Sequence, residues 1–126
     1  MKEIIIKTEN KKHVIDVTDQ INSNIDGAEG TCVLLLKHTT AALTTADLDP
    51  GTDLDMLDAI KAIAPNLKYR HPHDPVHAPD HIMSSIIGTN LCLPFKDGAL
   101  VLGTWQRVVL VELDGPRKRT IVIQFK

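Results

Sequence analysis

The sequence predicts a compact α+β domain of about seven to eight strands and two main helices, and three observations carry that prediction. Apolar strings separated by turn residues dominate residues 90–125, as expected for strands joined by hairpins. Two earlier segments, residues 52–64 and 79–88, place apolar residues at helical spacing between start and stop signals. At 126 residues, the chain has the length of a single domain spanning 1–126.

The N-terminal half begins with a predicted hairpin, residues 2–8 and 11–18, whose turn is "ENKK". Thr18 can cap a short helix that ends before Gly27. The run "TCVLLL" at 31–36 has no polar alternation, which favours a strand covered on both faces. The chain then continues in extended or irregular form toward Pro50.

The first main helix is expected over residues 52–64, with Thr52 as its cap and Pro65 as its stop. Its expected buried stripe consists of Met56, Leu57, Ile60, Ile63 and Ala64.

The second main helix is expected to start at Pro79 and to end at Gly88. Its residues divide into an apolar face, which we expect to be buried, and a small polar face, which we expect to be available to a ligand. The apolar face consists of Ile82, Met83, Ile86 and Ile87, and the polar face of His81, Ser84, Ser85 and Gly88.

Composition excludes several classes of protein. Hydrophobic residues make up 43% of the chain but aromatic residues only 3%, so the core must be aliphatic. The formal net charge of −2 argues against a general nucleic-acid binder. The only basic run, "GPRKR" at 115–119, is interpreted as a solvated face.

The sequence also predicts a cytoplasmic location. Cys32 and Cys92 lie in apolar strings, which favours two buried free thiols over a disulfide framework. The N-terminal residues carry charges on both sides of a three-residue apolar run, unlike a signal peptide. No segment approaches the roughly 18 apolar residues that a membrane crossing needs.

The stretch "YRHPHDPVHAPDH" at 69–81 holds four of the six histidines. They are His71, His73, His77 and His81, with Asp74 and Asp80 between them. One interpretation is a metal or anion site that uses at least two of these histidines. The other is a surface loop stiffened by proline, whose histidines are solvated.

His38 lies at the end of the apolar strand, where a rigid element can present a functional side chain. Asp47 and Asp49 follow it closely. They could orient a histidine, bind a divalent cation or cap the turn at Pro50.

The block "GTWQ" at 103–106 forms a further candidate site. Gly103 is unexpected inside a strand unless backbone or ligand approaches closely, and Trp105 could line a pocket or anchor the packing. Glu112 lies in an apolar strand, so a cation must meet its carboxylate. The candidate partners are Arg107, Arg117, Arg119 or a histidine.

Four segments together resemble one known family. They are "HTTAALTTADLDP", "YRH", "HAPDHIMSSIIG" and "PFKDGALVLGTWQRVVLVELDGPRKR", and they span roughly residues 30–125. This combination is similar to the YjbQ family of small proteins, described as secondary thiamine-phosphate synthases. Asp47 stands where that family usually has Glu, and His73 and His77 match no family feature.

The resemblance implies a β-sandwich-like α+β subunit that assembles into a homotrimer, with the active site near the subunit boundary. It maps the family's histidines onto His38, His71 and His81 and places the "GTWQ" block nearby. The implied reaction is displacement of diphosphate from a pyrimidine-methyl diphosphate by a thiazole phosphate. Its catalytic residues would be His38, Asp47, Trp105 and Gln106, and its substrate-binding residues Ser84, Ser85, Gly103, Thr104 and Arg119.

Two other functions stay open. Three convergent neutral histidines, His38, His71 and His81, would also fit a zinc-type centre that activates water for hydrolysis. A divalent metal, Zn²⁺ or Mg²⁺, is therefore an expected cofactor. The third interpretation is a trimeric protein that binds a small phosphorylated ligand without turnover.

Overall fold

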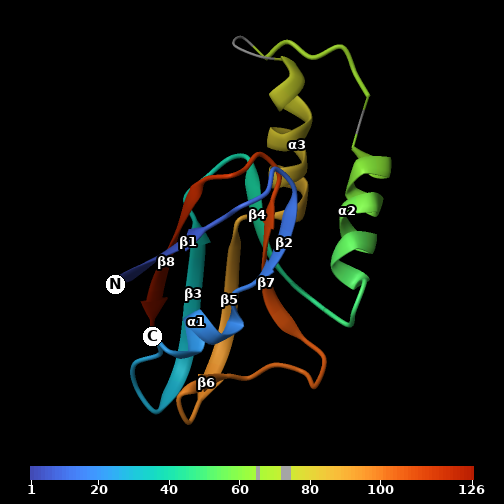
Figure 1. Ribbon diagram of the computed structural model, residues 1–126. Coiled ribbons are helices and arrows are strands. Elements are labelled where there is room, and N and C mark those ends of the chain that lie inside the picture. The colour runs from blue at the N-terminus through green and yellow to red at the C-terminus, as the bar shows by residue number, and fades with distance from the viewer. Residues whose placement is uncertain (65, 72–74) are drawn as a thin grey trace.

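The computed structural model describes residues 1–64, 66–71 and 75–126. Within them, the helical elements are α1 (Thr18–Asn22), α2 (Thr52–Ile63), the 3-10 turn η1 (Pro75–His77) and α3 (Ala78–Ile87). The strands are β1 (Lys2–Lys7), β2 (His13–Asp16), β3 (Glu29–Leu36), β4 (Ala41–Ala46), β5 (Asn90–Lys96), β6 (Ala99–Leu100), β7 (Arg107–Glu112) and β8 (Lys118–Phe125). The predicted α+β class is therefore confirmed (Figure 1).

The strands form two antiparallel sheets. One has five strands in the order β1-β8-β3-β5-β6, and the other has three in the order β2-β7-β4. In the small sheet, β7 is the central strand, and it pairs Glu112 with both His13 and Ala41. The other end of β7 lies beside the end of β4, where Arg107 pairs with Ala46.

Two hydrophobic cores lie on the two faces of the three-stranded sheet. The larger core joins that sheet to the five-stranded one, through residues such as Leu110 of β7 and Ile121 of β8. The smaller core joins the opposite face of the small sheet, at Val109 and Val111, to α2 and α3. The helices therefore cover the small sheet, and the sheet-on-sheet packing that the resemblance implied is observed (Figure 1).

The strand covered on both faces is β7 rather than the predicted residues 31–36. Every residue from Val108 to Glu112 is buried, whereas burial alternates along β3. Cys32, Leu34 and Leu36 point into the core, and Leu35 is 45% exposed. The sequence of an apolar run cannot distinguish a strand covered on both faces from one covered on a single face, because it does not show whether a leucine points into the core or to solvent.

Helix α2 agrees in position with the prediction but differs in detail. Its N-cap is Gly51, no side chain caps it, and the Thr52 hydroxyl instead donates to Asp47. No residue of α2 is fully buried, and Ile63 of the expected stripe is 65% exposed. The expected stop at Pro65 lies outside the described residues.

Helix α3 packs through a different face than the sequence suggested. Met83 is buried as expected, but so are the polar residues Asp80 and Ser84, while Ile82 and Ile86 are exposed. The polar side chains are buried because each finds a partner: Ser84 donates to the Ala41 carbonyl at 2.6 Å, and Asp80 accepts from Lys12 at 2.6 Å.

Two smaller expectations are also corrected. Cys32 is buried, but Cys92 is exposed, and both are free thiols. Gly103 does not lie inside a strand, because β6 ends at Leu100 and β7 begins at Arg107. None of the described helices combines the length and hydropathy that a membrane crossing requires.

Candidate functional site: a cationic cavity

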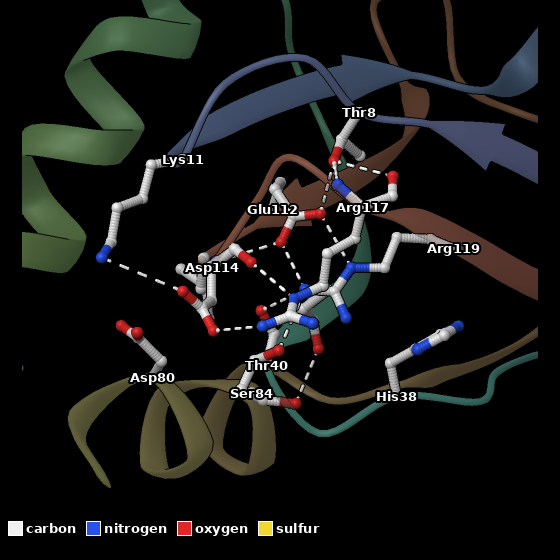
Figure 2. A network of polar contacts seen from close by, with 12 residues as sticks. Thr8, Lys11, His38, Thr40, Asp80, Ser84, Glu112, Asp114, Arg117 and Arg119 are labelled. Atoms are coloured by element: carbon white, nitrogen blue, oxygen red, sulfur yellow. Dashed lines mark hydrogen bonds and ion pairs between the residues drawn. The ribbon is translucent and has the colours of Figure 1, made fainter. Parts of the chain in front are cut away.

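A cavity of about 640 Å³ opens where the end of β7, the start of β8, the turn after β3 and the first turns of α3 meet. We call it the cationic cavity. His38, His77, His81, Arg117 and Arg119 line it, together with Lys37, Thr39, Thr40, Asp114 and Lys118. Figure 2 shows the polar network behind it.

The base of the cavity is a buried ion pair between Glu112 and Arg119, which are 0% and 2% exposed. The Arg119 Nε donates to Glu112 Oε2 at 2.7 Å, and Arg119 Nη2 donates to Glu112 Oε1. This two-point geometry is the strong form of an arginine–carboxylate pair. The prediction that a cation must meet Glu112 is confirmed, and Arg119 is that cation.

Further donors complete the shell around Glu112. The Thr8 hydroxyl donates to Oε2 at 2.9 Å and the Asp114 backbone N–H donates to Oε1 at 3.0 Å. Burial raises the pKa of Glu112, but the bonds from Arg119, Asp114 and Thr8 outweigh it and hold the pKa below its ordinary value. The carboxylate is therefore ionised at neutral pH.

Arg119 presents one nitrogen to the cavity. Its Nε and Nη2 are used by Glu112 and by Thr40, whose carbonyl and hydroxyl oxygens accept from Nη2 at 3.1 and 2.9 Å. Its Nη1 makes no hydrogen bond within the described part of the chain, and the residue lines the cavity. Nη1 is thus a fixed donor for an anion.

His38 lies on the Arg119 side of this network (Figure 2). The Thr120 backbone N–H donates to His38 Nε2 at 2.8 Å. Burial and then the Arg119 guanidinium hold the pKa of His38 below its ordinary value, so the ring is neutral at pH 7. Because Nε2 accepts, the single ring proton is on Nδ1, which is a hydrogen-bond donor.

His81 lines another wall of the cavity, and His71 packs against it. The His81 Nδ1 lies 2.9 Å from the Thr39 carbonyl oxygen, so Nδ1 carries a proton and donates. The His71 and His81 rings are stacked, with centroids 4.9 Å apart and an interplanar angle of 28°. The fold thus brings His38 and His81 to one cavity and holds His71 against His81.

These histidines do not fit a three-histidine metal centre. Nitrogen lone pairs lie in the ring plane, so two stacked, nearly parallel rings do not direct theirs at one point. The lone pair of His38 already accepts the Thr120 N–H. Among the described residues, no three His, Cys, Asp or Glu side chains are placed to hold a metal ion. We therefore derive no chemical step through a metal.

The electrostatic character of the cavity favours anions. Its lining includes the cations Lys37, Arg117, Lys118 and Arg119, against one described carboxylate, Asp114. Asp114 is itself bound by Arg117, at 3.0 Å. Burial raises the pKa of Asp114, but Arg117 outweighs it and holds the pKa below its ordinary value. Arg119 is paired with Glu112 behind the lining and Lys37 lies 3.7 Å from Glu3, so the excess positive charge of the cavity comes mainly from Lys118.

Of the predicted substrate-binding residues, Arg119 lines the cavity, whereas the two serines of α3 do not. The Ser84 side chain is buried and donates to the Ala41 carbonyl, so it anchors α3 to β4. Ser85 is exposed on the same helix. His77, which matched no family feature, does line the cavity, and His73 lies outside the described residues.

The "GTWQ" block lies at the opposite end of β7 from the histidines. Thr104, Trp105 and Asp47 border two shallow cavities of about 230 and 400 Å³, and Gly103 borders the larger one. Arg107 and Glu112 are the two ends of the six-residue strand β7, and a strand of that length spans about 17 Å. Within one chain, Asp47, Trp105 and Gln106 therefore do not share a cavity with His38, contrary to the expected proximity.

The contacts at that end hold a turn together. Gln106 donates to Thr45 at 3.1 Å and accepts from the Gly103 N–H at 3.1 Å. Asp47 accepts from the Thr52 hydroxyl at 3.3 Å. Arg107 is paired with Asp16 at 2.7 Å. Trp105 is 70% exposed.

Sequence reasoning missed several lining residues. Lys37, Thr40, Asp114, Arg117 and Lys118 belong to the runs "KHTT" and "LDGPRK", which directly follow strands that lead into the site. A charged run placed directly after a buried strand was the available signal, and it was interpreted as a solvated face.

Replacing Glu112 by Gln should destabilise the fold by about 3 kcal/mol or more at pH 7, because Arg119 would stay buried without its counter-ion. The folded pKa of Glu112 lies below its unfolded value of about 4.3. Its contribution is therefore complete above that pH and is lost as pH falls through the folded pKa. Denaturant unfolding across pH 3–7 should show the two proteins converging in acid.

Glu29→Gln, at an exposed glutamate of β3, is the matched control and should stay within about 0.5 kcal/mol of the wild type. Equal free energies of unfolding for the two variants would contradict the role assigned to Glu112.

Comparisons with known proteins agree with this architecture. The family of UPF0047 protein YjbQ-like sequences matches residues 2–126. A UPF0047 protein of Archaeoglobus fulgidus is 32% identical over 123 residues, covering 97% of this chain and 98% of that protein. The UPF0047 protein YjbQ of Salmonella typhimurium is 37% identical over 118 residues, covering 86% of each chain.

Solved structures give the same result. A conserved hypothetical protein from Thermus thermophilus superposes with a TM-score of 0.91 at 28% identity, covering 100% of both chains. A hypothetical protein from Aeropyrum pernix superposes with a TM-score of 0.87 at 34% identity, covering 99% of this chain and 96% of that one. The chain belongs to the YjbQ-like UPF0047 family.

Proposed function

We propose that the cationic cavity binds a phosphorylated small molecule, and that the protein is a cytoplasmic enzyme that displaces diphosphate from such a molecule. The observation that carries this proposal is the fixed pair of donors, Arg119 Nη1 and His38 Nδ1–H, in a cavity with excess positive charge. Both side chains are held by hydrogen bonds, Arg119 to buried Glu112 and His38 to the Thr120 backbone, so little reorganisation is needed when an anion arrives.

The donors suit a leaving diphosphate. In the proposed reaction, the thiazole nitrogen attacks the methylene carbon of a pyrimidine-methyl diphosphate. A C–N bond forms, the C–O bond breaks, and its electron pair leaves with the diphosphate. No proton needs to be removed, so the site needs anion stabilisation more than a strong base. Arg119 and His38 would supply it, and Lys37 and Lys118 at the opening would strengthen it.

A ligand-binding protein without turnover uses the same cavity and remains the second candidate. The zinc-type hydrolase has less support, because the Nε2 lone pair of His38 already accepts the Thr120 N–H and His81 stacks on His71.

His38→Ala should weaken the binding of inorganic pyrophosphate at least tenfold, because a hydrogen bond to a charged group contributes about 1.5–3 kcal/mol. Isothermal titration of the wild type and variant in chelator-treated buffer measures this. The wild type should also form thiamine phosphate from the pyrimidine diphosphate and thiazole phosphate, and His38→Ala should form less.

His13→Ala removes a histidine of β2 that does not line the cavity, and it should bind pyrophosphate like the wild type. Unchanged affinity in His38→Ala would sink the anion site. If the wild type binds pyrophosphate but forms no thiamine phosphate, the synthase activity is refuted and binding without turnover is supported.

We also propose that the chain assembles as a homotrimer in which the "GTWQ" end of one subunit approaches the cationic cavity of another. The exposure of Trp105, at 70%, supports this, since exposed tryptophan is enriched at protein interfaces. Ile5 and Leu35, on the outer face of the five-stranded sheet, are also largely exposed. Such an assembly would unite the two halves of the predicted site.

Light scattering should give three times the 13.9 kDa chain mass for the wild type, and Trp105→Ala should shift it toward a single chain. Leu54→Ala, at an exposed leucine of α2, should leave the assembly intact. A wild-type protein with the mass of one chain would refute the trimer.

A further inference from the structure

A second cavity, of about 390 Å³, opens between α2 and α3. We call it the α2–α3 groove. Its apolar lining comes from Leu57 and Ile60 of α2, Met83 of α3 and Leu113 after β7. It lies on the helix side of the small sheet, and the first turns of α3 separate it from the cationic cavity: His77 and His81 line the one, Asp80 and Met83 the other.

The groove exists because α2 is incompletely packed. The helix turns Leu57 and Ile60 toward the smaller core, yet none of its residues is fully buried. Apolar surface left facing a cavity loses the stabilisation that burial would give, about 25 cal/mol per Å². A ligand that fills the groove would recover this energy.

One side of the groove carries a buried carboxylate with unused capacity. Asp80 is 8% exposed, and its Oδ1 accepts from Lys12 Nζ at 2.6 Å. Lys12 Nζ also donates to the Leu113 carbonyl at 2.6 Å. Asp80 lines the groove, and no other hydrogen bond within the described residues reaches its carboxylate, so Oδ2 is available to accept one.

The charges that line the groove balance. Lys12 and Lys61 oppose Asp58 and Asp80, so neither a cation nor an anion gains net attraction. An apolar pocket with one free acceptor selects a molecule that has an apolar body and one hydrogen-bond donor. We propose that the α2–α3 groove binds a neutral, largely apolar molecule that carries one O–H or N–H group, which donates to Asp80 Oδ2.

Phenol is a suitable probe, and anisole, its methyl ether, lacks the donor. Methyl and amide NMR spectra of the full chain should show saturable phenol shifts at Ile60, Met83 and Leu113, with a dissociation constant of about 1 mM or tighter. Anisole and benzoate should each bind at least about fivefold more weakly than phenol. Anisole has no O–H group to donate to Asp80, and the charge of benzoate is not attracted by a groove whose own charges balance.

Two variants of α2 and its C-terminal end form a matched pair. Ala64 lines the groove, and Ala62 is exposed two residues earlier. Ala64→Phe should fill the groove and abolish the phenol shifts, whereas Ala62→Phe should bind phenol like the wild type.

The proposal is overturned if phenol gives no saturable shift, if anisole binds as well as phenol, or if the shifts fall at His38 and Arg119 instead. A change in mass by light scattering in Ala64→Phe alone would show that a second copy of the chain occupies the groove, which also overturns it. Should Ala64→Phe fail to fold, the ranking of the three probes on the wild type decides.

Discussion

The buried pair of Glu112 and Arg119 is the interaction on which the site depends. Glu112 ends β7 in the three-stranded sheet, and Arg119 lies near the start of β8 in the five-stranded sheet, so the pair ties the two sheets together at one end. A buried pair stabilises a fold only when its remaining donors and acceptors are satisfied. Thr8, Thr40 and the Asp114 backbone meet that condition here for all but Arg119 Nη1, which has no hydrogen bond within the described residues.

The same pair explains why the surrounding turn is constrained. Gly115 lies where a Cβ atom would collide with the Asn10 carbonyl oxygen and would approach Glu112 and Thr8 to 2.9 Å. The turn from β7 to β8 can therefore pass close to the β1–β2 connection only with glycine at this position. That close approach places Asp114, Arg117 and Arg119 around one opening, the cavity for which we propose anion binding.

Sequence patterns predicted where the helices and strands lie better than they predicted which faces are buried and which residues lie close together. Alternating or apolar runs with turn signals located the strands and both main helices, and a carboxylate in an apolar strand required a cation. Helical spacing separated Ser84 from Met83, but it could not show that both would be buried, because the acceptor of Ser84 is a backbone carbonyl of β4. Burial of Asp80 likewise depends on Lys12, distant in sequence.

The candidate site was only partly predictable, because it too depends on contacts between segments that are distant in sequence. His38 and His81 do reach one cavity, but "GTWQ" and His38 lie at opposite ends of a strand pair, and the length of β7 sets that separation. The tautomer of His38 follows from the Thr120 N–H, a backbone contact between segments that no local pattern contains. That contact uses the Nε2 lone pair of His38 and leaves Nδ1–H as a hydrogen-bond donor.

The tautomer of His38 is therefore the most direct test of the account. Long-range proton–nitrogen NMR correlations at pH 7 should show His38 with a protonated Nδ1 and an unprotonated Nε2, and pyrophosphate should shift the Nδ1 signal. A proton on Nε2, or a response of His38 to zinc but not to pyrophosphate, would contradict the account.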